Sequence, residues 1–252
     1  RKREYLQARE KKMRNAFAAA RQALLTAGFP ESAIQEHMQE KKMSAARHAC
    51  SLAEIRKVDA VLVPKRVSSS LEGFLKDDST SSLLQHCRVS PIWIIDGSVN
   101  PVHAAVCLNA GNRSLMAADH AAFMLSETSA RITVLYAAKS IRETLSCPSG
   151  SMPEDLKGWL RTDEGRKIGP LMEKAVSILK EEGISEERME LAVVPAGGGA
   201  AQGILSHCRS KEIGTVVLGR SDSGGETWSF LKGSVTRKLL ADARNMAVFL
   251  AR

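Results

Sequence analysis

The last part of the chain decides the fold, and it contains three readable segments: IGTVVLG (213–219), GSVTRKLLADA (233–243) and MAVFL (246–250). The first and third are short and apolar, which is typical of buried strands, and the second predicts a helix. A buried strand, a helix and a second buried strand predict two parallel strands joined by a right-handed crossover.

The same pattern occurs earlier in the chain. Positions about 155 residues apart match, which indicates an internal repeat. Phe74-Leu75-Lys76 corresponds to Phe230-Leu231-Lys232, and Trp93 corresponds to Phe249. The sequence therefore predicts a tandem repeat, with an incomplete first domain at 1–96 and a complete second domain at 97–252. The shorter first copy has two open explanations: the chain is a fragment, or the first copy is degenerate.

Strands and helices alternate through the second copy. We expect strands at 103–108, 131–137, 189–194, 213–218 and 246–250, and helices at 113–126, 164–182, 200–211 and 233–243. Residues 140–163 are expected to be irregular. The first copy is expected to hold strands at 34–39, 60–63 and 92–95. The alternation predicts an α/β fold, an open parallel sheet with helices on both faces.

Three loops of the second copy, 109–114, 195–203 and 219–225, follow strands at the end of the sheet where such folds bind ligands. The third is the most informative, because its glycines let the backbone approach a ligand and a helix start suited to phosphate follows it. An ordinary loop with a capped helix fits the pattern equally well. The candidate nucleotide-binding residues are Asn109, Gly219, Arg220, Gly224, Gly225, Gly233, Ser234 and Val235.

Together these features resemble the universal stress protein family. Val216-Val217-Leu218-Gly219 and the later Gly233-Ser234 match the two ends of the G-x2-G-x9-G-[ST] motif of the family's nucleotide-binding members, whose middle glycine would fall at Asp222. Asn109 stands where the family has an Asp that contacts the nucleoside. The resemblance implies a Rossmann-like, adenine nucleotide alpha hydrolase-like fold and a site for ATP or another adenine nucleotide.

Composition narrows the class of protein. A hydrophobic fraction of 44% with 25% charged residues excludes a wholly disordered chain. No apolar run is long enough to span a bilayer, so no membrane partner is expected. The five cysteines are scattered without metal-ligand spacing, which predicts no metal, no disulfide framework and a reducing cytoplasm.

The first residues carry much of the net charge of +8. Leu6, Met13, Phe17, Ala20 and Leu24 recur at helical spacing, which predicts an amphipathic helix. Its basic face is expected to be solvated or to lie near an acidic partner, and nucleic-acid binding is not expected.

Three functions remain open. The first is a universal-stress-type regulatory or stress-response protein with an adenine-nucleotide site in the second domain. The alternatives are a scaffold that binds no nucleotide and acts by dimerisation, and a weak ATP hydrolase. No catalytic motif favours an enzyme.

Two further expectations concern assembly and asymmetry. The terminal strands of the two copies are sheet edges, and we expect them to pair, either as an intramolecular pseudo-dimer or in a homo-oligomer. The first copy should bind no nucleotide, because Pro64 follows its strand and Asp77 and Asp78 occupy the helix start.

Overall fold

The computed structural model describes residues 2–38, 42–65, 83–84, 86–87, 89–220 and 235–251. The chain divides into two compact units, Arg1–Lys42 and Met43–Arg252. The first unit contains the long helix α1 (Lys2–Thr26) and the short 3-10 helix η1 (Glu31–Ala33). Gly28, with a φ of +91°, ends α1 in the left-handed conformation that glycine tolerates best.

The strand expected at 34–39 is wrong for its described part, since residues 34–38 form no strand. Strands need a hydrogen-bonded neighbour, and the described part of this unit contains no other strand. Ile34 is followed by polar residues that remain exposed, so a buried apolar face does not develop there.

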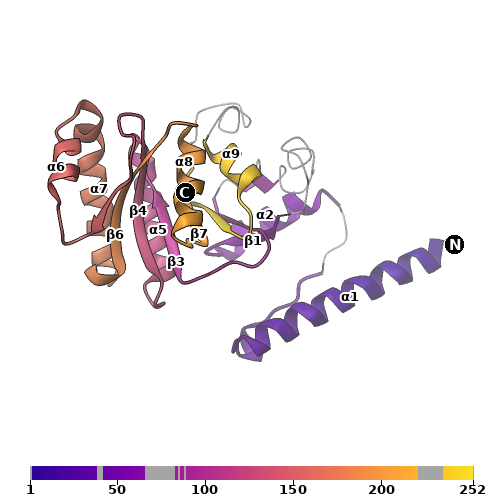
Figure 1. The fold of residues 1–252 in the computed structure, drawn as a ribbon. Coiled ribbons are helices and arrows are strands. Elements are labelled where there is room, and N and C mark those ends of the chain that lie inside the picture. The colour runs from indigo at the N-terminus through magenta and orange to yellow at the C-terminus, as the bar shows by residue number, and fades with distance from the viewer. Residues whose placement is uncertain are drawn as a thin grey trace. The chain divides into compact units, whose positions relative to one another are not determined.

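The second unit is built on one sheet of eight strands in the order β1-β2-β8-β7-β3-β4-β6-β5 (Figure 1). Neighbours are parallel except for β2 with β8 and β5 with β6, which are antiparallel. The sheet is thus mixed but mostly parallel, as the buried apolar strands predicted. The strands are β1 (Val61–Pro64), β2 (Ile92–Ile95), β3 (His103–Cys107), β4 (Arg131–Ala138), β5 (Leu145–Pro148), β6 (Met189–Pro195), β7 (Thr215–Gly219) and β8 (Ala247–Ala251).

Helices cover both faces of this sheet and bury two separate hydrophobic clusters. On one face lie α2 (Ala45–Arg56), α8 (Ala200–Ser210) and α9 (Val235–Asp242). On the other lie α5 (Leu115–Leu125), α6 (Glu154–Leu160) and α7 (Asp163–Glu181), with the 3-10 helices η2 (Asn112–Ser114) and η3 (Glu186–Arg188) in the connections. The predicted elements of the second copy are confirmed, except that 140–163 holds β5 and α6 and is therefore not irregular.

The terminal strands of the two copies pair within the chain, which confirms the expected pairing. β2 and β8 run antiparallel, with Trp93 opposite Phe249 and Ile95 opposite Ala247. The sheet consequently continues across the division predicted between residues 96 and 97. Pairing satisfies the backbone groups that each edge would otherwise leave open.

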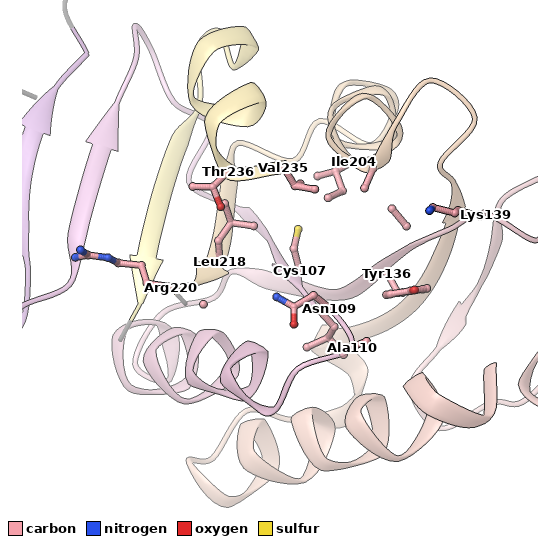
Figure 2. A pocket seen from close by; sticks show the side chains of 14 residues that line it. Cys107, Asn109, Ala110, Tyr136, Lys139, Ile204, Leu218, Arg220, Val235 and Thr236 are labelled. Atoms are coloured by element: carbon pink, nitrogen blue, oxygen red, sulfur yellow. The ribbon is translucent and has the colours of Figure 1, made fainter. Parts of the chain in front are cut away.

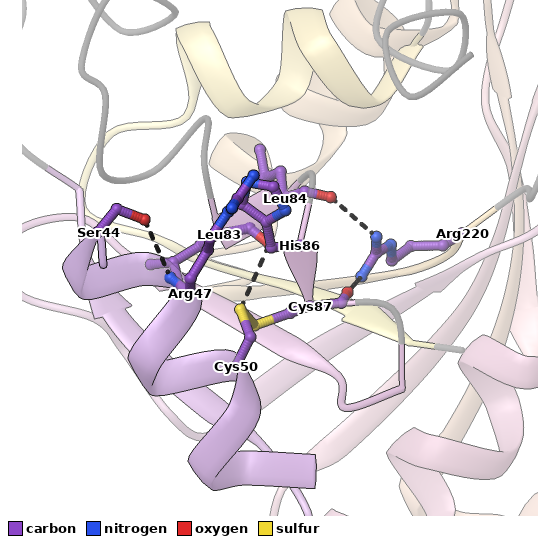
Figure 3. The surroundings of a disulfide bond; sticks show 8 residues. All are labelled: Ser44, Arg47, Cys50, Leu83, Leu84, His86, Cys87 and Arg220. Carbon is purple, nitrogen blue, oxygen red and sulfur yellow. Dashed lines mark hydrogen bonds between the residues drawn. A yellow bond between two sulfur atoms is a disulfide. The ribbon is translucent and has the colours of Figure 1, made fainter. Parts of the chain in front are cut away.

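A disulfide joins Cys50 of α2 to Cys87 and corrects the expectation that the cysteines would stay unpaired (Figure 3). Both residues pack into the cluster on the α8 and α9 face of the sheet, so their Cα atoms lie 4.9 Å apart although 37 positions separate them in sequence. Spacing in sequence does not show this proximity, because the fold creates it. Cys107, Cys147 and Cys208 are free thiols and buried.

Lys65 follows β1 at the place where the second copy has Arg220. Its side chain is buried, and the ammonium donates to the carbonyls of Ala241 at 3.2 Å and Ala243 at 2.7 Å. Burial lowers the pKa of this ammonium. The cation is thereby used at the C-terminal end of α9, where the helix dipole favours positive charge.

No helix in the described ranges has both the length and the apolar character that crossing a membrane requires.

Candidate functional site

A cavity of about 360 Å³ lies where β3, β4 and β7 end, beneath α8 and the start of α9 (Figure 2). This volume falls within the range of small-molecule sites. The lining residues are Cys107, Leu108, Asn109, Ala110, Tyr136, Ala137, Lys139, Ala200, Ile204, Leu218, Gly219, Arg220, Val235 and Thr236.

The strand order explains why a cavity forms here. β3 has β4 on one side and β7 on the other, so the chain leaves β3 in one direction and later returns to its opposite edge. The helices α5 and α9, which come after β3 and β7 in the chain, lie on opposite faces of the sheet. Open α/β sheets bind ligands in the crevice formed at such a reversal.

Four of the predicted site residues line this cavity: Asn109, Gly219, Arg220 and Val235. The remaining four, Gly224, Gly225, Gly233 and Ser234, lie outside the described residues, and so does Asp222. Asp77 and Asp78 of the first copy also lie outside them.

Asn109 shapes the loop after β3. Its side-chain oxygen accepts a hydrogen bond of 2.8 Å from the Gly111 amide, and its carbonyl accepts one of 3.2 Å from the Ser114 hydroxyl. The first bond forms an Asx turn, which fixes the side-chain amide with its nitrogen on the cavity side (Figure 2). The side chain thus offers a hydrogen-bond donor where an Asp would offer an acceptor.

Glycine is the one residue type that fits at position 219, the end of β7. A Cβ atom built there would lie 2.1 Å from the Arg113 carbonyl oxygen, which belongs to the backbone of the loop after β3. The backbones after β3 and β7 therefore lie in close contact beside the cavity.

Arg220 lines the cavity with its backbone, but its side chain points away from it (Figure 2). The guanidinium donates to the carbonyl of Cys87 at 2.7 Å and of Leu84 at 3.1 Å, beside the disulfide (Figure 3). Only 8% of the residue is exposed. The positive charge expected to face a phosphate is instead committed to the main chain of the first copy.

β4 and the loop after it also line the cavity, with Tyr136 and Lys139, which were not among the predicted site residues. The Tyr136 hydroxyl donates to Glu164 at 3.1 Å, and the amides of Lys139 and Ser140 donate to the same carboxylate at 3.1 Å each. The rule that selected the ends of the other strands would also have selected the end of β4. The loop after β4 was not predicted to bind a ligand, because it contains no glycine.

These hydrogen bonds set the charge of Glu164. Burial raises the pKa of its carboxyl, but hydrogen bonds from Ser140, Lys139 and Tyr136 outweigh burial and bring the pKa below its ordinary value. Burial and the neighbouring carboxylate raise the pKa of Tyr136 to about 12. Glu164 is thus a fixed anion that holds the loop after β4 in place.

Cys107 extends its sulfur toward the cavity from β3 (Figure 2). Burial raises the pKa of its thiol well above the usual value, with Cys208 adding to the shift. A neutral thiol is a poor nucleophile. Cys107 therefore serves as part of the apolar wall.

Two helices start at the cavity. Ala200 begins α8, where Gly199 is the N-cap with a φ of +101° and no side chain caps the helix. Val235 begins α9. Helix N-termini favour anions through their amide groups and dipole. No group of three His, Cys, Asp or Glu residues that could hold a metal occurs within the described part of the chain.

Comparison with known proteins gives a structural match alone. No protein-family model and no curated protein matches the chain. A universal stress protein from Archaeoglobus fulgidus DSM 4304 is similar over 99% of this chain and 79% of its own, with 15% identity and a TM-score of 0.64. The functionally unknown protein PA1789 from Pseudomonas aeruginosa PAO1 is similar over 94% of this chain and 76% of its own, with 14% identity and a TM-score of 0.52.

The mostly parallel sheet with helices on both faces and a cavity at its strand reversal defines a Rossmann-like α/β protein. Within that class, the chain has the fold of the universal stress proteins, as its sequence resemblance predicted.

Proposed function

We propose that this chain is a regulatory protein of the universal stress type that binds an adenine nucleotide in the cavity of its second domain, residues 97–252. The observation that carries the proposal is the convergence of three strand ends and two helix starts on one cavity of about 360 Å³. A parallel α/β sheet of this order binds its ligands at such a place.

The lining suits the parts of a nucleotide. Ile204, Leu218 and Cys107 offer an apolar surface for a flat base. The uncapped start of α8 and the start of α9 favour phosphate oxygens. We place the base near Asn109 and the phosphates over Gly219 and the loop 220–234 that leads to α9, so that Gly224, Gly225, Gly233 and Ser234 remain part of the proposed site.

Lys139 takes over the electrostatic role first assigned to Arg220. The Lys139 side chain is exposed and belongs to the cavity lining, whereas the Arg220 guanidinium is bonded to Leu84 and Cys87. An exposed ammonium at the mouth of the cavity is a mobile positive charge that attracts phosphate.

The first domain, residues 1–96, is proposed to be incomplete and to bind no nucleotide. Pro64 ends β1, and Lys65 fills the next position with a side chain that is buried against the end of α9. The glycine that ends the equivalent strand β7 is thus replaced by Pro64, and the Lys65 side chain packs where a ligand would need room.

A scaffold that acts without nucleotide is the second candidate, and Arg220 is the observation that favours it. The arginine ties the loop after β7 to the first copy, which gives that loop a structural purpose independent of a ligand. An equilibrium titration of the full chain with ATP, AMP and cyclic AMP separates the two candidates. Saturable heat with any of the three supports the nucleotide site, and its absence with all three supports the scaffold.

A further inference from the structure

Helix α1 carries a narrow apolar stripe along one side. Met13 is 42% exposed and Leu24 is 39% exposed, and Phe17 and Ala20 continue the stripe between them. In the described residues of the unit Arg1–Lys42, the 3-10 helix η1 is the one other helical element. Within its own unit, α1 therefore has no α-helix with which to bury this stripe.

The spacing of the stripe is that of a coiled coil. The steps from Leu6 through Met13, Phe17 and Ala20 to Leu24 follow a strict heptad, with Leu6, Met13 and Ala20 at d and Phe17 and Leu24 at a. A repeat confined to a and d gives a narrow seam, whereas a helix that lies on a globular core or a lipid surface presents a wider apolar face.

Basic residues occupy four of the seven positions that flank this seam, and the other three, Gln7, Ala16 and Ala23, are uncharged. Lys2 and Arg9 occupy g positions, and Arg14 and Arg21 occupy e positions; no acidic residue stands at e or g. In a coiled coil, residues at e and g face those of the partner helix and determine which partner is accepted. A second copy of α1 would place arginine opposite arginine, which disfavours self-association in either orientation.

Arg14 and Arg21 already make ion pairs at the surface of the protein. Arg14 donates to Glu10 at 2.5 Å across one helical turn. Arg21 pairs with Glu31 and, at 3.6 Å, with Glu36 of the segment that follows the helix. Exposed ion pairs contribute little to stability, so the guanidinium groups remain able to exchange partners.

We propose that α1 forms a heterotypic coiled coil with a helix of another protein that carries apolar residues at a and d and Glu or Asp at e and g. Both features of the helix are used: the narrow seam is buried, and its basic flanks are matched by acidic ones. The other two a positions of the helix hold Arg3 and Glu10. Polar residues at a positions fix register, so the partner should present an acidic or amide side chain opposite Arg3 and a basic or amide side chain opposite Glu10.

The test uses the full chain and two labelled peptides, followed by fluorescence anisotropy. Both peptides are four heptads long, with Leu at d, Asn at the two a positions opposite Arg3 and Glu10, and Ile at the other a positions; one has Glu at every e and g position, and the other has Lys there. The expected result is saturable binding of the acidic peptide, at least ten-fold tighter than the basic one. Phe17→Asp should abolish binding, and circular dichroism should show that α1 and the rest of the protein remain folded.

A matched pair of variants isolates the flanking positions. Arg9→Glu with Arg14→Glu should reverse the preference, so that the basic peptide binds better. Lys11→Glu with Lys12→Glu changes the net charge equally but lies outside the seam, and it should keep the preference for the acidic peptide. The proposal is overturned if both double variants behave alike, if neither peptide binds, or if sedimentation shows self-association that Phe17→Asp removes. Binding of α1 to vesicles of phosphatidylcholine and phosphatidylglycerol at 3:1, with no binding of the acidic peptide, would assign the stripe to a lipid surface and would also overturn it.

Discussion

Trp93 and Phe249 stack face to face in the antiparallel pair of β2 and β8, with ring centroids 3.8 Å apart and planes 6° from parallel. The sequence repeat aligns these same two residues with each other, and the strand register places them directly opposite. The indole nitrogen of Trp93 donates to Nε2 of His120 at 2.8 Å, which anchors the pair to α5. The strand pairing therefore joins two positions that the predicted repeat makes equivalent.

Removal of this stacking pair should destabilise the protein strongly. Phe249 is 6% exposed, so Phe249→Ala leaves a cavity beside Trp93 between β2 and β8. The substitution should lower the free energy of unfolding by about 3–5 kcal/mol. Urea denaturation followed by tryptophan fluorescence measures the cost. Phe123→Ala is the control, because Phe123 is 58% exposed on α5 and should cost about 0.5 kcal/mol or less. Equal costs for the two variants would contradict the stacked pair.

The disulfide between Cys50 and Cys87 should appear in a thiol count. Alkylation of the unfolded chain should modify three cysteines without a reductant and five after reduction with dithiothreitol. Reduction should also destabilise the fold by about 4 kcal/mol, because the bond closes a loop of 37 positions in the unfolded chain. Five reactive thiols before reduction would show that the bond does not form.

Acid should destabilise the protein through buried His103. The residue is 2% exposed, and its Nε2 lies 2.8 Å from the Thr133 hydroxyl. Burial is the main cause that lowers the pKa of His103, and the charges of Arg131 and His207 lower it further. A backbone hydrogen bond with Lys211 and the charge of Glu190 raise it, but by less. Burial likewise lowers the pKa of His207.

The sign follows from proton linkage. A histidine with a depressed pKa binds its proton more readily in the unfolded chain, so stability is full above pH ~6.5 and falls as the pH drops toward the folded pKa. Urea midpoints measured from pH 7.5 to 5 should decline, and His103→Gln should flatten the decline. His37→Gln, at an exposed position, should leave the decline unchanged. An unchanged slope in His103→Gln would exclude a buried neutral imidazole.

Arg220 should prove structural. Arg220→Met leaves the carbonyls of Leu84 and Cys87 without their donor, and a cost of about 2–4 kcal/mol is expected for buried polar groups left unpaired. Nucleotide affinity should change by less than three-fold, because the guanidinium points away from the cavity. Lys139→Gln should do the opposite and weaken nucleotide binding with little effect on stability. A large loss of affinity in Arg220→Met would return the arginine to the site.

The fold was predictable because burial leaves a direct trace in sequence. The apolar runs of β3, β4, β6, β7 and β8 are covered on both faces, so each was visible without a partner. β5 was missed because it is a short edge strand whose exposed Ser146 and Pro148 resemble a loop. The predicted strand at 34–39 failed over its described residues for the converse reason: Ile34 is apolar, but the described part of its unit contains no strand to pair with it.

The site was predictable as a place but not as a set of side chains. Strand ends and glycines located the cavity, since they report where the backbone turns. The direction of the Arg220 side chain could not be read from sequence, because it depends on carbonyls that lie 133 and 136 positions away. The disulfide could not be predicted for the same reason, since tertiary packing alone brings Cys50 to Cys87.

Calorimetric titration of the full chain with ATP, in parallel with a matched pair of variants, tests the central claim most directly. Val235→Glu places a carboxylate at the exposed start of α9, where it would repel a phosphate, and Lys238→Gln alters the net charge equally farther along the same helix. We predict saturable binding to the unchanged chain and to Lys238→Gln, and a loss of at least ten-fold in affinity for Val235→Glu. Binding that Val235→Glu leaves intact, or no binding to the unchanged chain, would contradict a nucleotide site in this cavity.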